Sequence, residues 1–279
     1  MMTIKQPSLS AFETADGYKI SYRHWRPEAV SKAVVIIVPG FNSHSGYYQW
    51  AAENFIEGGF EVYAIDLRGR GNSDGERYYI GDYHDLIADI DQLVNISKAS
   101  HPELSHFLLG HSAGGVFSAI YALQHQDKLR GFICESFAFQ VPAPDFALAV
   151  LKGISHLAPH AHVLKLKNED FSRDAAAVEV MDNDPLIANE VQPTKTMQQL
   201  VLADEQLKAE MKNIQLPLLI LHGTADKAAK PSGSRYFFEH AASHDKTIKL
   251  YEGHYHDLLN DMGKAQVMND ILEWLKARV

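Results

Sequence analysis

A serine at position 112 lies between two glycines in the pattern Gly-x-Ser-x-Gly, with Gly110 before it and Gly114 after it. An apolar run over 106–109 precedes the pattern, and a helical pattern over 116–126 follows it. A strand, a sharp turn and a helix in this order expose a serine hydroxyl beside the first amides of the helix. The pattern therefore predicts that Ser112 is a nucleophile. The alternative interpretation is a strand-to-helix turn with a capping serine.

A serine hydroxyl needs a base, and the base needs an orienting acid. In open parallel sheets the reactive groups gather at the carboxyl ends of the strands, so we looked for acids that follow strands. Asp226 comes directly after the predicted strand 216–221 and is our choice, although it could also be a turn residue before a helix. Asp184 and Asp204 lie in the middle of the chain and fit this position less well.

Two histidines follow the predicted strand 247–251 and compete for the role of base. We choose His256, and His254 is the alternative, which would otherwise line the pocket or bind within the loop. A further histidine, His222, is expected to bind the backbone of the loop that carries Asp226.

An acyl-transfer reaction also needs backbone amides that stabilise the oxyanion. One amide is expected from Ala113, which directly follows the predicted nucleophile. The other is expected from the loop after the apolar strand 33–38, and we choose Phe41. The Phe41 ring is also compatible with a pocket wall.

The elements that position these residues alternate between strands and helices, which predicts a mostly parallel α/β sheet flanked by helices. A hairpin around Asp16-Gly17 opens the chain, and the run 33–38 is apolar on both faces, as in a central strand. The predicted strands cover 11–14, 18–22, 33–38, 60–66, 106–109, 131–135, 216–221 and 247–251. The predicted helices cover 47–57, 82–100, 116–126, 232–241 and 264–278.

This alternation stops over 139–212, where we predict no strand and instead helices at 143–157, 173–181 and 193–212. The α/β pattern then resumes. The sequence therefore predicts a core formed by 1–138 and 213–279, with a helical cap, 139–212, inserted after the sixth strand.

Composition excludes several classes of function. The chain of 279 residues has a formal net charge of −9, which disfavours nucleic acid as a partner. The glycine-rich segment 67–75 lacks the spacing of a phosphate-binding loop. The single cysteine, Cys134, excludes intrachain disulfides, and the histidines show no metal-ligand spacing. With no signal-peptide pattern over 1–15 and no apolar run of about 20 residues, we expect a soluble, cytoplasmic protein.

Four motifs together resemble the monoacylglycerol lipase and lysophospholipase branch of the α/β-hydrolases, which is grouped with serine aminopeptidase-like enzymes. They are Gly110-His111-Ser112-Ala113-Gly114-Gly115, Asp66-Leu67-Arg68-Gly69-Arg70-Gly71-Asn72-Ser73, His222-Gly223-Thr224-Ala225-Asp226-Lys227 and Tyr255-His256-Asp257-Leu258-Leu259-Asn260. The similarity covers nearly the whole chain, and the stretches 172–174 and 183–186 resemble the cap of that family. The order Ser, Asp, His along the chain is also that of the α/β-hydrolase fold.

This resemblance implies Ser112 as nucleophile, Asp226 as acid, His256 as base, and the Phe41 and Ala113 amides as oxyanion donors. It implies no cofactor and no metal. Two positions depart from the family pattern. Pro39 stands where the family usually has histidine, and alanine stands at 113 where methionine is common.

The expected reaction is hydrolysis of a small-molecule ester or lipid through an acyl-enzyme, with a monoacylglycerol or lysophospholipid-type monoester as preferred substrate. The predicted helix 143–157 is apolar over much of its circumference, which fits a buried core helix, a tunnel wall or a surface in transient contact with a membrane. We expect five residues to line the acyl pocket: Phe41, His111, Phe137, Phe146 and Val150.

Other functions share the same three residues or need none of them. A short-chain carboxylesterase, a thioesterase or an aminopeptidase would use the same triad. An aminopeptidase would also need acids that bind the substrate amine, for which Glu169, Asp170 and Glu205 are candidates. A non-catalytic binding protein is disfavoured because all three triad residues are present. The sequence does not indicate an oligomeric state.

Overall fold

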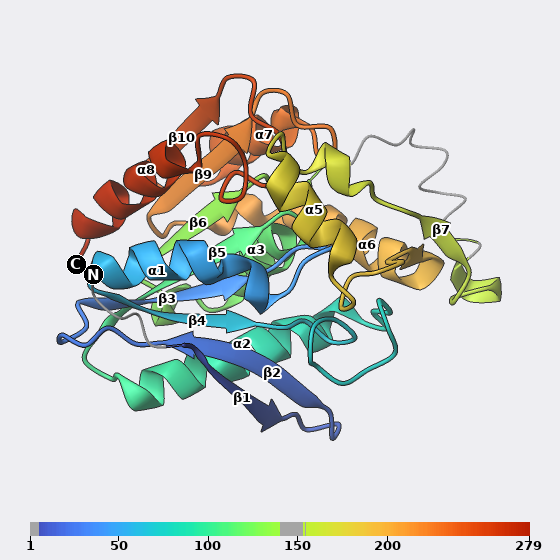
Figure 1. The fold of residues 1–279 in the computed structure, drawn as a ribbon, viewed down its shortest axis with the longest axis horizontal. Coiled ribbons are helices and arrows are strands. Elements are labelled where there is room, and N and C mark those ends of the chain that lie inside the picture. The colour runs from blue at the N-terminus through green and yellow to red at the C-terminus, as the bar shows by residue number, and fades with distance from the viewer. Residues whose placement is uncertain (1–5, 140–152, 154) are drawn as a thin grey trace.

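The computed structural model describes residues 6–139, 153 and 155–279, and its centre is an eight-stranded sheet (Figure 1). The strands are β1 (Ser8–Glu13), β2 (Lys19–Trp25), β3 (Ala33–Val38), β4 (Phe60–Ile65), β5 (Ser105–His111), β6 (Gly131–Glu135), β9 (Leu218–Gly223) and β10 (Lys246–Tyr251). They lie in the order β1-β2-β4-β3-β5-β6-β9-β10. β2 pairs antiparallel with β1 and with β4, and all other neighbours are parallel. This is the α/β-hydrolase arrangement that the sequence predicts.

Helices cover both faces of the sheet and bury its apolar side chains (Figure 1). On one face lie α1 (Gln49–Glu57) and α8 (Lys264–Lys276). On the other lie α2 (Tyr83–Ser100), α3 (Ala113–Gln124), α6 (Thr194–Glu210) and α7 (Pro231–His240). Alternate residues of β3 enter the two cores, with Val34 and Ile36 on one side and Val35 and Ile37 on the other. The strand is therefore apolar throughout because both of its faces are covered.

The predicted elements are found with shifted ends at two places that matter for chemistry. β5 continues to His111 and α3 begins at Ala113, so that Ser112 alone forms the turn between them. β9 continues to Gly223, so that His222 lies inside the strand, whereas the sequence places it after the strand. In both cases pairing with a neighbouring strand extends the strand beyond its apolar run.

The segment between β6 and β9 contains two predicted helices, found as α5 (Ala175–Asn183) and α6. The expectation that this segment has no strand is wrong. β7 (His162–Leu164) and β8 (Gln192–Pro193) pair antiparallel, and strands this short carry no periodic signal in the sequence. The predicted helix 143–157 lies largely outside the described residues. Within the part of the chain that is described, no helix is both long and apolar enough to cross a bilayer.

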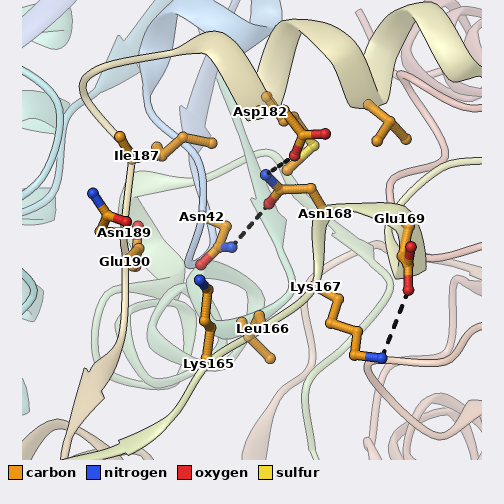
Figure 2. A pocket seen from close by; sticks show the side chains of 13 residues that line it. Asn42, Lys165, Leu166, Lys167, Asn168, Glu169, Asp182, Ile187, Asn189 and Glu190 are labelled. Atoms are coloured by element: carbon orange, nitrogen blue, oxygen red, sulfur yellow. Dashed lines mark hydrogen bonds and ion pairs between the residues drawn. The ribbon is translucent and has the colours of Figure 1, made fainter.

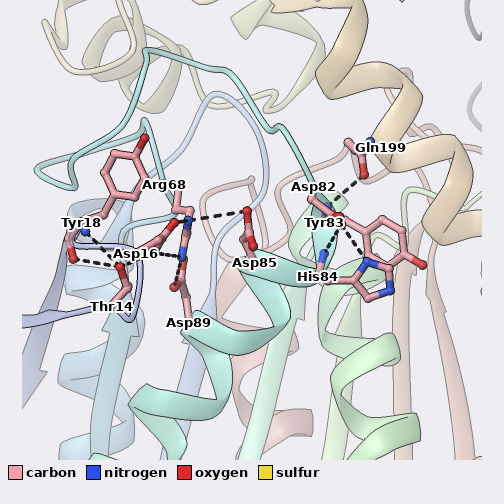
Figure 3. A network of polar contacts seen from close by, with 10 residues as sticks. All are labelled: Thr14, Asp16, Tyr18, Arg68, Asp82, Tyr83, His84, Asp85, Asp89 and Gln199. Atoms are coloured by element: carbon pink, nitrogen blue, oxygen red, sulfur yellow. Dashed lines mark hydrogen bonds and ion pairs between the residues drawn. The ribbon is translucent and has the colours of Figure 1, made fainter. Parts of the chain in front are cut away.

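An arginine ties the segment that follows β4 to the rest of the fold (Figure 3). Arg68 donates to Asp89 on α2 and to Asp16 in the turn of the β1–β2 hairpin. The hydrogen bond from Arg68 is the main reason that the pKa of Asp16 is lowered to about 2. These ion pairs hold the glycine-rich segment 67–75 on both sides. Arg68 therefore has a structural role.

Candidate active site

Ser112 occupies a strained turn that only small neighbours allow. Its backbone has φ 55° and ψ −124°, an unfavourable conformation for a residue with a side chain. A Cβ at Gly110 would lie 2.6 Å from the Ser118 Oγ, and a Cβ at Gly114 would lie 2.2 Å from the Pro39 carbonyl oxygen. Both predicted glycines are therefore required by close packing. This turn conformation places the Ser112 side chain at the carboxyl end of β5.

His256 and Asp226 form a hydrogen-bonded chain with Ser112. The Ser112 Oγ lies 2.7 Å from His256 Nε2, and His256 Nδ1 lies 2.7 Å from Asp226 Oδ2. Because an ionised carboxylate only accepts hydrogen bonds, Nδ1 carries the proton and Nε2 is free to accept the proton of Ser112. The arrangement can therefore activate the serine as a nucleophile.

Several donors hold the Asp226 carboxylate. Its Oδ1 accepts from the amides of Ala228 and Ala229 at 2.8 and 2.9 Å, and its Oδ2 lies 3.0 Å from His222 Nε2. Burial raises the pKa of Asp226, but His256 and His222, by charge and by hydrogen bonds, outweigh burial and bring it far below its usual range. The carboxylate is therefore ionised near neutral pH.

His222 contributes to the site in a way that sequence reasoning only partly found. It was expected to bind the backbone of the Asp226 loop, and its Nε2 does approach the Ala229 carbonyl at 3.4 Å. The shorter contact, however, is the one with the Asp226 carboxylate. The Ser234 hydroxyl lies 2.7 Å from His222 Nδ1 and can donate to it, which leaves the Nε2 proton for Asp226.

The other histidine of the loop, His254, lies away from Ser112. Its ring is next to Tyr251, and its Nδ1 lies 3.8 Å from Asp261 Oδ2. Its carbonyl oxygen accepts from the Ala225 amide and so fixes the loop that carries Asp226. Of the two candidates, His256 is therefore the one that the structure brings to Ser112.

The loop after β3 packs directly on the serine. A Cβ at Gly40 would lie 2.7 Å from the Ser112 Cβ and 3.0 Å from the His111 carbonyl oxygen. Neither of the predicted oxyanion amides, those of Phe41 and Ala113, donates a hydrogen bond to another described residue. Two free amides beside the nucleophile are what an oxyanion requires. We keep their role as a proposal.

A buried arginine supports the Phe41 side chain. The Arg70 guanidinium lies over the Phe41 ring at 4.3 Å, and it donates to Glu190 and Gln192 near β8. Arg70 and Glu190 are both almost wholly buried. The loop after β3, which carries Phe41, is held at its other end by Asp66, whose carboxylate accepts from the Ser45 amide at 2.7 Å. Sequence patterns do not reveal the Arg70–Glu190 pair, because 120 residues separate its members.

The remaining predicted pocket residues have different surroundings. The His111 ring lies 5.0 Å from that of His256, and burial first, then the charge of His256, lowers its pKa to about 3. Phe137 is wholly buried and packs against Phe139 and Phe237, so it belongs to the core beneath the site. The last two predicted residues, Phe146 and Val150, lie outside the described residues.

A polar cavity of about 560 Å³ begins one residue from Phe41 (Figure 2). Asn42 forms its inner side, and Asn168 and Asp182 continue a chain of hydrogen bonds across it. Two buried acceptors, Asn42 Oδ1 and Glu190 Oε2, have no hydrogen-bond partner among the described residues. Lys165 and Lys167 also line the cavity, so it presents both donors and acceptors to a polar ligand.

Comparison with known proteins gives a consistent result. The family model described as serine aminopeptidase, S33, matches residues 29–263. The monoacylglycerol lipase of Mycolicibacterium smegmatis is 30% identical over 269 residues, which cover 95% of each chain. The human monoglyceride lipase is 29% identical over 99% of this chain and 93% of its own. The crystal structure of the Paleococcus ferrophilus monoacylglycerol lipase superposes with a TM-score of 0.82 at 29% identity, over 99% of this chain and 100% of that chain.

Proposed function

The chain belongs to the serine aminopeptidase S33 family, and from that premise we propose that Ser112 hydrolyses monoacylglycerol-type monoesters through an acyl-enzyme. The protein is a carboxylic ester hydrolase, as its similarity to monoacylglycerol lipases shows. The observation that carries the assignment of residues is the continuous hydrogen-bonded chain from Ser112 through His256 to Asp226.

The chemistry follows from this chain of hydrogen bonds. His256 Nε2 accepts the proton of Ser112 as the oxygen attacks the ester carbonyl, and the Phe41 and Ala113 amides stabilise the oxyanion. The imidazolium then gives its proton to the departing alcohol. Water that transfers its proton to the same nitrogen attacks the acyl-enzyme and releases the acid. Asp226 holds the imidazole in the tautomer that this sequence requires.

The first experiment is a series of p-nitrophenyl esters from two to sixteen carbons. We expect a maximum at medium or long chains, and we expect Ser112→Ala to lower kcat by at least about 10³-fold. Ser8→Ala, a surface serine on β1, is the matched control and should leave kcat unchanged. A maximum at two to four carbons would contradict the lipid substrate while leaving the triad intact.

We further propose that the cavity of Figure 2 binds the alcohol part of the substrate. The cavity lining includes acceptors such as Asp182, which suit glycerol hydroxyls, and also Lys165 and Lys167, which would attract a phosphate. Asn42 has φ 51°, so Asn42→Gly removes the side chain without backbone strain.

A comparison of two substrates with one acyl chain tests this assignment. Asn42→Gly should lower kcat/KM about tenfold for a monoacylglycerol and less than twofold for the p-nitrophenyl ester, since the latter has no polyol. Equal losses on both substrates would show that Asn42 acts on the oxyanion loop instead.

An aminopeptidase activity receives less support. Two of the three acids that could bind a substrate amine are already paired: Glu169 lies 3.6 Å from Lys167, and Asp170 lies 3.8 Å from Lys227. Their charge is therefore compensated within the protein. We expect no release of p-nitroaniline from amino-acid p-nitroanilides under conditions in which the esters are cleaved.

The predicted cap, 139–212, remains our proposal for the contact with lipid. Leu157, at the end of the predicted apolar helix, is 89% exposed. An exposed apolar side chain at this place suits transient binding to a membrane surface. Leu157→Asp should lower the fraction of protein that sediments with neutral lipid vesicles and leave the hydrolysis of short soluble esters unchanged.

We also propose a cytoplasmic location, in keeping with the single buried cysteine.

A further inference from the structure

Two carboxyl groups lie buried behind the loop that carries His256. Glu135 ends β6, is wholly buried, and is paired in register with His111, the residue before Ser112. Asp257 directly follows His256 and is also buried. One nitrogen or oxygen from each of His111, Glu135 and Asp257 lies within 4.8 Å of the other two. Two acids therefore share one small interior space next to the imidazole.

No lysine or arginine neutralises these acids in the part of the chain that the structure describes. Neither Glu135 nor Asp257 takes part in an ion pair there, and Lys264 of α8 lines a cavity beside Asp257 without pairing with it. The titratable groups that act on Glu135 and Asp257 from the surrounding elements are His111, Tyr47, Tyr48, Cys134, Tyr251, His256 and Asp261. Two uncompensated carboxylates at this separation would repel each other strongly.

A proton removes this repulsion. Burial first, and then the charge of Asp257, raises the pKa of Glu135 well above its usual range. Burial also raises the pKa of Asp257, whose Oδ2 accepts from the Asn260 side chain at 3.0 Å. His111, whose pKa is lowered to about 3, stays neutral and adds no positive charge. The pair therefore holds one proton and one negative charge near neutral pH.

Glu135 connects the two segments that carry the nucleophile and the base. Its backbone carbonyl accepts from the Ser112 amide at 2.9 Å, and its Oε1 accepts from the Leu259 amide at 3.2 Å. Its Oε2 is buried and makes no hydrogen bond to any described residue. The side chain thus links the end of β6 to the loop that continues from His256.

We propose that Glu135 is a positioning residue for the reaction, and that it holds the His256 loop as a neutral carboxylic acid that carries the single proton of the pair it forms with Asp257. This inference rests on the proposed roles of Ser112 and His256. Because Glu135 is neutral, the pair places only the single negative charge of Asp257 behind the His256 imidazole. The acceptor for Leu259 keeps the imidazole at hydrogen-bonding distance from Ser112.

The kinetic experiment compares two substitutions at one position. Glu135→Ala removes the acceptor for Leu259, and we expect kcat to fall at least tenfold with KM changed less than twofold. Glu135→Gln keeps an acceptor and is permanently neutral, so it should restore most of the lost kcat. A Gln variant that is as slow as the Ala variant would overturn the proposal, because it would show that the ionised form is needed.

The stability experiment tests the shared proton without using activity. A raised pKa means that the folded protein keeps a proton which the unfolded chain releases, so wild-type stability falls as pH rises above the usual carboxyl pKa. Glu135→Gln cannot ionise, and its Tm relative to wild type should rise by about 3 °C or more between pH 5 and pH 9. A constant Tm difference over this range would contradict the proposal.

The acid limb of kcat/KM supplies a third readout. Asp257→Asn leaves a neutral pair behind His256 and should move this limb to lower pH, whereas Glu135→Gln keeps the charge of Asp257 and should leave it in place. Metal analysis belongs to the same experiment, and one tightly bound divalent ion per chain would overturn the shared proton. Wild-type protein without esterase activity would instead refute the proposed function. The Tm comparison would still decide the state of the pair.

Discussion

The substitution Asp226→Asn tests the proposed triad most directly, because it changes chemistry while keeping shape. The amide oxygen of asparagine can accept from the Ala228 and Ala229 amides, as the carboxylate Oδ1 does at 2.8 and 2.9 Å. The amide nitrogen then replaces Oδ2 and presents donors to two histidine nitrogens that are themselves donors, His256 Nδ1 and His222 Nε2. The conflict is relieved if His256 takes the opposite tautomer.

The opposite tautomer removes the base. With its proton on Nε2, the His256 imidazole points a donor at the Ser112 Oγ, which lies 2.7 Å away. Loss of the buried charge that faces the imidazolium costs about 3–5 kcal/mol, or about 10²- to 10⁴-fold in rate. The reference case of a serine protease triad shows about 10⁴-fold for the same substitution. We therefore expect kcat to fall about 10³- to 10⁴-fold, with little change in KM because the Asp226 side chain is wholly buried.

The assay is the steady-state hydrolysis of a medium-chain p-nitrophenyl ester, together with the rate of labelling by a fluorophosphonate. Labelling reports the nucleophilicity of Ser112 separately from deacylation and should fall in parallel with kcat. Asp89→Asn is a matched control, because Asp89 is a buried acid in an ion pair with Arg68 far from the site. It should lower Tm but leave kcat within about twofold. An Asp226→Asn enzyme that retains a tenth of wild-type kcat would refute the assigned role.

Two further predictions concern stability. Gly114→Ala should lower the free energy of unfolding by more than about 3 kcal/mol, since its Cβ would lie 2.2 Å from a backbone oxygen. Gly81→Ala is the control: its Cβ would meet only a tyrosine ring at 3.5 Å, and the free energy of unfolding should change by less than about 1 kcal/mol. Burial raises the pKa of Glu61, but hydrogen bonds from His24 and Ser31 outweigh it and lower this pKa to about 2. The stability that ionised Glu61 contributes is therefore present above the usual carboxyl pKa and lost as pH falls towards 2. Urea titrations should show Glu61→Gln about 3 kcal/mol less stable than wild type at pH 7, with the difference falling to below about 0.5 kcal/mol only near pH 2.

Local patterns were sufficient for most of the sheet. Runs such as 33–38 are apolar on both faces, and the structure buries every residue of that strand. Turn residues at Asp16-Gly17 predicted the hairpin, which is found as the antiparallel pair β1 and β2. The positions of Ser112, Asp226 and His256 after strands followed from topology, because parallel strands bring their carboxyl ends to one edge.

Local patterns were not sufficient where tertiary contacts decide the outcome. His254 and His256 lie two residues apart in the same loop, and only the path of that loop turns one of them towards Ser112. β7 and β8 have three and two residues, too few for any periodicity. Their pairing depends on the segments around them and could not be found from their own residues.

Buried polar pairs are the feature of this structure that sequence patterns predict least, and they also affect function most. An acid such as Glu135 at the end of an apolar strand resembles an ordinary strand terminus until its partner is known. That partner, Asp257, lies far from Glu135 in the sequence, and a sequence motif records neither their distance nor their burial. Because both groups are buried, the pair holds one proton and one negative charge beside the base. The electrostatic setting of His256 is therefore a property of the fold, and it has to be tested by changing Glu135 and Asp257 together and separately.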